Sequence, residues 1–183
     1  MSMKIAILGW GSLLWDNREE FKEFVKQLAE GTWKEDGPSL PLEFSRVSQS
    51  RGRALTLVID PANGTPTTVA WRLSKRKKVE DAINDLQYRE STSEKFIGWI
   101  CLTNENQPVP SKVDRVSLNQ SDPSQFDEHK QAINKWASTQ HLDAVIWTNV
   151  ESNFEDANLL EKGKKFTVVH ALVHLQKLPP EGK

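Results

Sequence analysis

The residues best suited to chemistry form a glycine-serine turn close to the N-terminus. Gly9, Trp10, Gly11, Ser12 and Leu13 directly follow a short apolar run. Because glycine has no Cβ, Gly9 and Gly11 permit unusual backbone angles and let a ligand lie against main-chain N–H groups. Together with the Ser12 hydroxyl, such a turn suits a carboxylate or a developing oxyanion. A glycine pair after a strand is also common in plain tight turns, so the pattern by itself leaves both interpretations open.

More specific motifs do not fit this turn. A dinucleotide-binding fingerprint needs a third small residue where Leu14 stands, and a phosphate-binding P-loop needs a lysine before its serine or threonine. A nucleophile elbow needs a glycine two positions after its serine, and this position is again Leu14. We therefore do not expect Ser12 to act as a nucleophile.

A carboxylate, Glu90, continues the apolar stripe of a predicted helix. The stripe consists of Val79, Ala82, Ile83 and Leu86. Glu90 lies four positions after Leu86, which places it on the same helix face. A carboxylate that faces the interior loses hydration, which raises its pKa and makes it a better proton acceptor near neutral pH. Two alternatives stay open, namely a helix that frays before Glu90 and a structural ion pair with an arginine. Three arginines are considered for such a pair: Arg51, Arg53 and Arg89.

The elements that must position these residues are mainly strands. Predicted strands cover 4–8, 42–49, 54–60, 67–73, 95–103, 113–118, 143–148 and 166–176. Predicted helices cover 17–30, 74–89 with Ser74 as its cap, a segment that begins at 122–123, and 155–161. We expect strands 54–60 and 67–73 to form a hairpin, and strand 95–103 to lie centrally in a sheet. Strands and helices do not alternate regularly, which favours an α+β fold over a doubly wound sheet.

Length and charge limit the class of protein. A chain of 183 residues fits one domain, which we expect over 1–178, with 179–183 as a tail. The 24 basic and 25 acidic side chains nearly cancel, so no global field attracts nucleic acid or an anionic membrane. No segment approaches the roughly 20 apolar residues of a membrane helix, and no cleavable signal pattern is present. The single cysteine, Cys101, excludes an intramolecular disulfide. We predict a cytoplasmic protein that binds neither nucleic acid nor membrane, and its oligomeric state stays open.

The histidines do not form a convincing metal site. His170 and His174 lie among β-branched and apolar residues that favour a strand, which would separate the two by about 13 Å. No third ligand is evident, so no metal is expected. His129, His141 and the acidic residues beside the Glu90 stripe, which include Asp85, are expected at the surface.

Three segments resemble a known family. The turn Gly-Trp-Gly-Ser-Leu at 9–13 resembles the Gly-Tyr-Gly-Ser-Leu signature of γ-glutamylcyclotransferase-like proteins, especially of their glutathione-specific branch. Arg51 and Gly52, before a Leu-Thr-Leu strand, resemble the Arg-Gly segment of that branch. The stretch 86–90 resembles its segment that ends in Arg-Glu, whose glutamate is catalytic. Order and rough spacing agree over about half of the chain, with Trp10 in place of the family tyrosine.

This resemblance implies a small mixed β-barrel-like sheet with flanking helices and an enzyme that needs no cofactor. The implied reaction converts a γ-glutamyl amide or peptide into 5-oxoproline and a free amine. The substrate's own α-amine attacks its γ-carbonyl, so proximity supplies much of the rate. Glu90 would move the proton, and the turn 9–13 would bind the polar groups of the substrate. Arg51 would pair with the substrate's α-carboxylate. The alternative, prompted by Trp10, is a non-catalytic module of the same fold that binds a small ligand or a partner.

Overall fold

The computed structural model describes residues 3–15, 29–102, 123–155, 159–161, 164 and 166–178. Contacts within the chain define two compact units. The first unit comprises Met1–Ser39 and Thr68–Asn149, and the second comprises Leu40–Thr67 and Val150–Lys183. The single domain expected over 1–178 stays a prediction.

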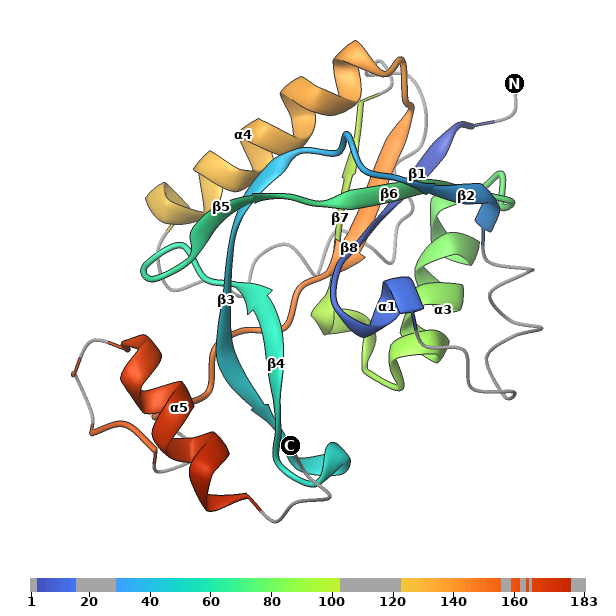
Figure 1. Cartoon of the computed structure of the whole chain (residues 1–183). Coiled ribbons are helices and arrows are strands. Elements are labelled where there is room, and N and C mark those ends of the chain that lie inside the picture. The colour runs from blue at the N-terminus through green and yellow to red at the C-terminus, as the bar shows by residue number, and fades with distance from the viewer. Residues whose placement is uncertain are drawn as a thin grey trace. The chain divides into compact units, whose positions relative to one another are not determined.

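A five-stranded mixed sheet forms the centre of the first unit (Figure 1). Its strands are β1 (Ile5–Gly9), β2 (Ala29–Lys34), β6 (Ala70–Ser74), β7 (Ile97–Cys101) and β8 (Ala144–Thr148). They lie in the order β2-β6-β1-β8-β7. The central strand β1 pairs with β6 in antiparallel and with β8 in parallel orientation. Both edges and both faces of β1 are therefore covered, which explains why all five of its residues are buried and apolar or glycine.

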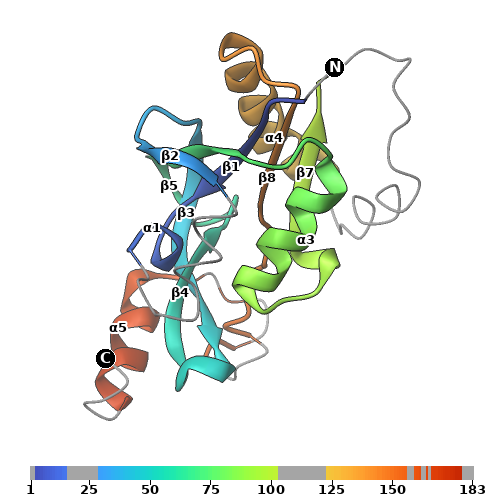
Figure 2. The same ribbon diagram turned by 90° about the vertical axis from the view of Figure 1, so that its right-hand side faces the viewer.

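Helices cover both faces of this sheet, as Figure 2 shows for α3 and α4. The helices of the unit are α1 (Ser12–Trp15), α3 (Val79–Glu90) and α4 (Pro123–Thr139), with a 3₁₀ turn η2 (Glu94–Phe96). Ile5 and Ile7 of β1 pack with the apolar stripe of α3. Leu8 points to the other face, where its cross-strand partner Trp71 makes an edge-to-face contact with Trp136 of α4 at 5.2 Å.

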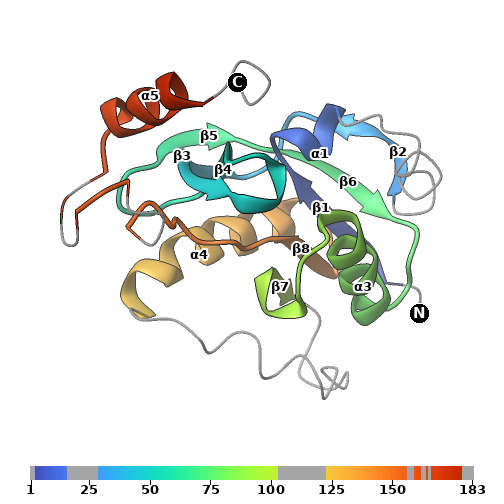
Figure 3. The ribbon, with the colours of Figure 1, turned by 90° about the horizontal axis from the view of Figure 1, so that it is seen from below.

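The second unit combines a three-stranded sheet with one helix (Figure 3). Its elements are β3 (Ser39–Ser48), η1 (Gln49–Arg51), β4 (Ala54–Ile59), β5 (Thr65–Thr68) and α5 (Val168–Lys177). The strand order is β4-β3-β5. A small core of Val47, Phe154, Phe166 and Ala171 joins the sheet to α5 and to the chain that leads into it.

The mixed α+β class is confirmed, and the described strands form no closed barrel. The strands there form one sheet of five and one of three, and the larger sheet ends at β2 on one side and at β7 on the other. A barrel requires these two end strands to pair with each other. Among the described strands β7 lies at one end of the sheet, and because 103–122 are not described, the central position expected for strand 95–103 stays a prediction.

The C-terminal element is a helix, and the strand predicted over 166–176 is wrong. The β-branched and apolar residues of this segment favour a strand locally. The structure instead buries Ala171, His174 and Leu178, whose spacing fits one helix face. Thr167 and His170 form a capping box at the start of this helix, with histidine in the position where glutamate or glutamine is usual.

Two further boundaries differ from the prediction. Ala29 and Glu30 begin strand β2 instead of ending a helix, and Gly31 adopts a φ of 67° where the register of β2 shifts. Strand β4 pairs with β3 and not with 67–73, and β5 pairs with the other edge of β3. In the connection between β4 and β5, Gly64 passes so close to Pro41 that a Cβ there would lie 2.5 Å from the Pro41 carbonyl oxygen. Residues 17–28, strand 113–118 and part of helix 155–161 lie outside the described residues.

Candidate active site

The glycine-serine turn begins where the central strand β1 ends. Gly9 pairs with Ala70 of β6, and the indole of Trp33 packs directly on its Cα. A Cβ at this position would lie 2.5 Å from two carbons of the Trp33 ring. Gly9 is therefore required because a side chain would clash with Trp33. The sequence had instead suggested that glycine is needed here for unusual backbone angles.

Gly11 supplies that backbone freedom. It adopts a φ of 56°, in the left-handed region, and a Cβ there would meet no other atom within 4 Å. Its carbonyl accepts a hydrogen bond from the N–H of Leu14 at 3.1 Å, which closes the turn into the short helix α1. The Leu13 side chain belongs to the hydrophobic core, so this residue offers only its main chain to a ligand. Trp10 and Ser12 are half-buried.

Helix α3 continues to Glu90, which excludes the alternative that the helix frays before this residue. It ends in a Schellman arrangement, with Ser91 at φ 48° donating its N–H to Tyr88 O and Thr92 donating to Gln87 O. The carbonyls of the last turn are thus satisfied, and the helix does not fray before Glu90. This helix end fixes the direction in which Arg89 and Glu90 project.

Arg89 connects the end of α3 to the turn. Its side chain is 3% exposed, and its Nη2 donates a hydrogen bond to the main-chain oxygen of Ser12 at 3.4 Å. Its Nη1 lies 3.6 Å from Oε1 of Glu90, whose side chain is 22% exposed and whose Oε1 is shielded from solvent. Two predicted site elements, the turn and Glu90, are thus joined through one guanidinium. Of the two alternative interpretations of Glu90, only the second, an ion pair with an arginine, is observed.

Arg89 was not predicted as a site residue. It was considered only as one of three candidate ion-pair partners of Glu90. The signal was available, because Arg89 lies three positions after Leu86 and therefore on the same buried stripe. A charged residue at such a position is retained only with partners, since burial of an unpaired charge is very costly.

Asp85 corrects another expectation of the sequence analysis. It was predicted to be solvated, but it is buried and accepts two hydrogen bonds from Arg76, at 2.6 and 2.9 Å. Arg76 precedes the helix, because Ser74 ends strand β6 and α3 starts only at Val79. The pair is therefore nine residues apart in sequence, a separation that helix spacing does not reveal.

Arg51, the predicted carboxylate-binding residue, belongs to the second unit. Its Nη2 donates to Thr56 Oγ1 at 2.7 Å, and its Nε donates to Ser48 Oγ at 3.3 Å. These bonds hold the exposed side chain against β3 and β4. A role of Arg51 in substrate binding stays a prediction.

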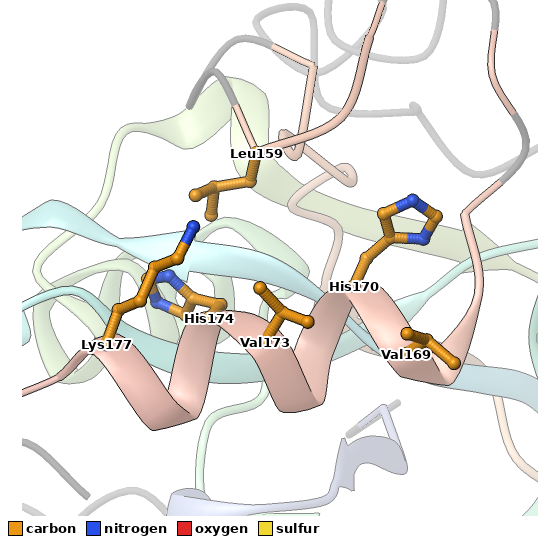
Figure 4. A pocket seen from close by; sticks show the side chains of 6 residues that line it. All are labelled: Leu159, Val169, His170, Val173, His174 and Lys177. Atoms are coloured by element: carbon orange, nitrogen blue, oxygen red, sulfur yellow. The ribbon is translucent and has the colours of Figure 1, made fainter.

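The histidines of α5 line a small pocket of about 140 Å³ (Figure 4). Because the segment is helical, His170 and His174 lie one turn apart, and not the strand distance predicted. His170 Nδ1 accepts the N–H of Thr167 at 3.0 Å, and His174 Nε2 donates to the carbonyl of Arg53 at 2.7 Å. Both rings thus serve the structure of the second unit. Among the described residues, no group of three or more His, Cys, Asp or Glu side chains could hold a metal ion.

His129 and Cys101 are both shielded and uncharged near neutral pH. His129 is 6% exposed, which corrects its predicted surface position, and burial followed by the charge of Lys130 lowers its pKa to about 4. Burial raises the pKa of the Cys101 thiol, so this group is a poor nucleophile.

Comparisons of the chain with protein-family models, with curated proteins and with solved structures give no match. No helix in the described part of the chain is long and apolar enough to cross a membrane. The arrangement of Glu90, Arg89 and the turn is therefore the basis for assigning a function.

Proposed function

We propose that this protein is a γ-glutamylcyclotransferase-like enzyme, which converts a γ-glutamyl amide or peptide into 5-oxoproline and a free amine. Glu90 is its general acid and base, and the turn Gly9–Leu13 binds the substrate. A fold of the γ-glutamylcyclotransferase type is part of the same proposal, as is a cytoplasmic location.

One observation supports this proposal above all. Arg89 donates to the Ser12 carbonyl and pairs with Glu90, so that the carboxylate and the turn meet at one guanidinium. Two of the three segments that resemble this family, 9–13 and 86–90, are more than 70 residues apart along the chain. Their proximity in space is what a shared site requires.

The proposed chemistry needs a carboxylate and main-chain N–H donors in one site, and Arg89 contacts both Glu90 and the turn. Glu90 accepts a proton from the substrate's α-ammonium, and the freed amine attacks the γ-carbonyl. A C–N bond forms to close the five-membered ring, and the original amide C–N bond breaks. The ring nitrogen loses its remaining extra proton to solvent, and the proton held by Glu90 passes to the leaving amine. N–H groups of the turn, with Ser12, hold the polar groups of the substrate.

The test is a turnover assay on a panel of γ-glutamyl amides, with 5-oxoproline quantified by mass spectrometry. We expect Glu90→Gln to lower the turnover number at least about a hundredfold, which is the usual contribution of a positioned acid or base. Asp81→Asn is the matched control, because Asp81 is an exposed carboxylate in the first turn of the same helix. Equal turnover by wild type and Glu90→Gln would exclude the role assigned to Glu90.

A second candidate function is a module that binds a small ligand without chemistry. Two tryptophans flank the turn, Trp10 at its start and Trp15 at the end of α1, and the Trp15 side chain is 66% exposed. Exposed aromatic rings offer binding surface without any proton transfer. This candidate predicts that γ-glutamyl compounds raise the melting temperature of the protein and yield no 5-oxoproline.

A further inference from the structure

We propose that Arg89 is a positioning residue, which orients the Glu90 carboxylate towards the turn and holds the turn in place through the Ser12 carbonyl. This inference rests on the proposed function. It assigns to Arg89 a role that is exerted through its contacts with Glu90 and with the turn.

The first argument is geometric. A guanidinium is planar and rigid, and its two terminal nitrogens project at fixed angles. Nη2 is bonded to Ser12 O in the turn and Nη1 lies 3.6 Å from Glu90 Oε1 on the helix. One rigid group therefore sets the distance between the turn and the carboxylate. A flexible lysine ammonium cannot fix both directions at once.

The second argument concerns charge. Burial of Oε1 disfavours the ionised carboxylate, which is the form that can accept a proton. A guanidinium at 3.6 Å opposes this effect, because an opposite charge within about 4–6 Å favours the charged form. Arg89 is itself almost fully buried, so solvent screens this attraction little.

The experiment measures the titration of Glu90 independently of turnover. The side-chain carboxyl is followed by ¹³C NMR in labelled wild type, Arg89→Met and Arg89→Lys, and its signal is assigned with Glu90→Gln. We expect Arg89→Met to raise the titration midpoint of Glu90 by about one pH unit or more, and Arg89→Lys to restore most of this shift. Arg76→Met is the control, since it removes an arginine that pairs with a different carboxylate of α3, Asp85. It should leave the Glu90 midpoint unchanged.

A second measurement separates orientation from charge. Arg89→Lys retains the positive charge but not the fork, so we expect its turnover number to fall about tenfold while KM changes little. An unshifted Glu90 midpoint in Arg89→Met, or wild-type turnover in Arg89→Lys, would overturn the inference. If wild type shows no turnover but the midpoint shifts as expected, the proposed reaction fails while the contact between Arg89 and Glu90 is upheld. If Arg89→Met does not fold, the kinetics of Arg89→Lys decide.

Discussion

Two glycines two positions apart are required for different physical reasons. Gly9 lacks a Cβ because the Trp33 ring occupies that space, whereas Gly11 lacks one because its backbone is left-handed. The same residue type therefore answers a packing constraint at one position and a conformational constraint at the other. Substitutions can distinguish the two.

We expect Gly9→Ala to lower the free energy of unfolding by about 1–3 kcal/mol, the usual cost of overpacking a core. Gly11→Ala should cost about 1–2 kcal/mol through backbone strain alone. Urea denaturation of both variants measures these changes. Adding Trp33→Leu should reduce the cost of Gly9→Ala but not that of Gly11→Ala. Equal effects of Trp33→Leu on both would contradict the assigned reasons.

His129 makes the stability of the protein depend on pH. Its pKa is about 4 in the folded state, below the ordinary value of 6.5, so the unfolded chain binds the proton more readily. Stability from this group is fully present above pH 6.5 and is lost as the pH falls towards 4. We expect a loss of roughly 3 kcal/mol over this range, measured by urea denaturation at several pH values. In His129→Leu the corresponding part of the pH dependence should disappear. An unchanged profile in that variant would contradict the assignment.

At the scale of elements, the end of α3 is strained at one residue. Ser91 occupies the left-handed position of a Schellman motif, where glycine is usual. The helix nevertheless ends there, and the N–H groups of Ser91 and Thr92 satisfy two carbonyls of its last turn. His141 has a φ of 53° at the end of α4, where its N–H donates to Ser138 O and the N–H of Leu142 donates to Ala137 O.

Ser91→Gly should therefore stabilise the protein by about 0.5–1 kcal/mol, since glycine adopts the left-handed angles without strain. The measurement is a urea denaturation curve at constant pH. Asn84→Gly is the matched control, because Asn84 is exposed in the middle of the same helix. That substitution should destabilise by about 1 kcal/mol. The interpretation fails if both glycines destabilise alike.

Local patterns predicted the elements that bury a continuous apolar segment. Strands β1 and β8 and most of α3 and α4 were predicted correctly, because their hydrophobic spacing agrees with their final burial. Helix α5 was predicted as a strand, since β-branched Val168, Val169 and Val173 point to solvent and dominated the local pattern. The buried residues within α5 are Ala171 and His174, whose spacing fits a helix. Which residues become buried depends on tertiary contacts, and local sequence patterns do not reveal these contacts.

In the candidate site, too, local features were predicted and a long-range contact was not. Glu90 and the turn were found from spacing and residue type, which are local signals. Their connection through Arg89 depends on two segments far apart in the sequence, and periodicity carries no information on such a contact. The strand order of the sheets was also beyond local patterns, because β5 pairs with β3 and not with β4, which directly precedes it in the sequence.

At the scale of the whole molecule, apolar surface is distributed unevenly. The outer face of α5 exposes four aliphatic side chains: Val168, Val169, Leu172 and Val173. The core of the second unit is small and contains Phe154, which is 1% exposed and stacks edge-to-face on Phe166 at 4.9 Å.

Truncation should distinguish these two environments sharply. We expect Phe154→Ala to lower the free energy of unfolding by about 3–5 kcal/mol, and Leu172→Ala, at a side chain 53% exposed, to change it by less than about 0.5 kcal/mol. Differential scanning calorimetry and urea denaturation provide the values. A large cost for Leu172→Ala would mean that the outer face of α5 is covered in solution.

Strand β1 is hydrogen-bonded on both edges and buried on both faces, and the turn Gly9–Leu13 continues directly from it. Amide protons of β1 should therefore be among the slowest to exchange with deuterated solvent in the first unit. Because the turn continues directly from this rigid strand, its backbone should lose little conformational entropy when a small molecule binds. Affinity at the turn would then depend mainly on the complementarity of the contacts, with little entropy spent on ordering the backbone.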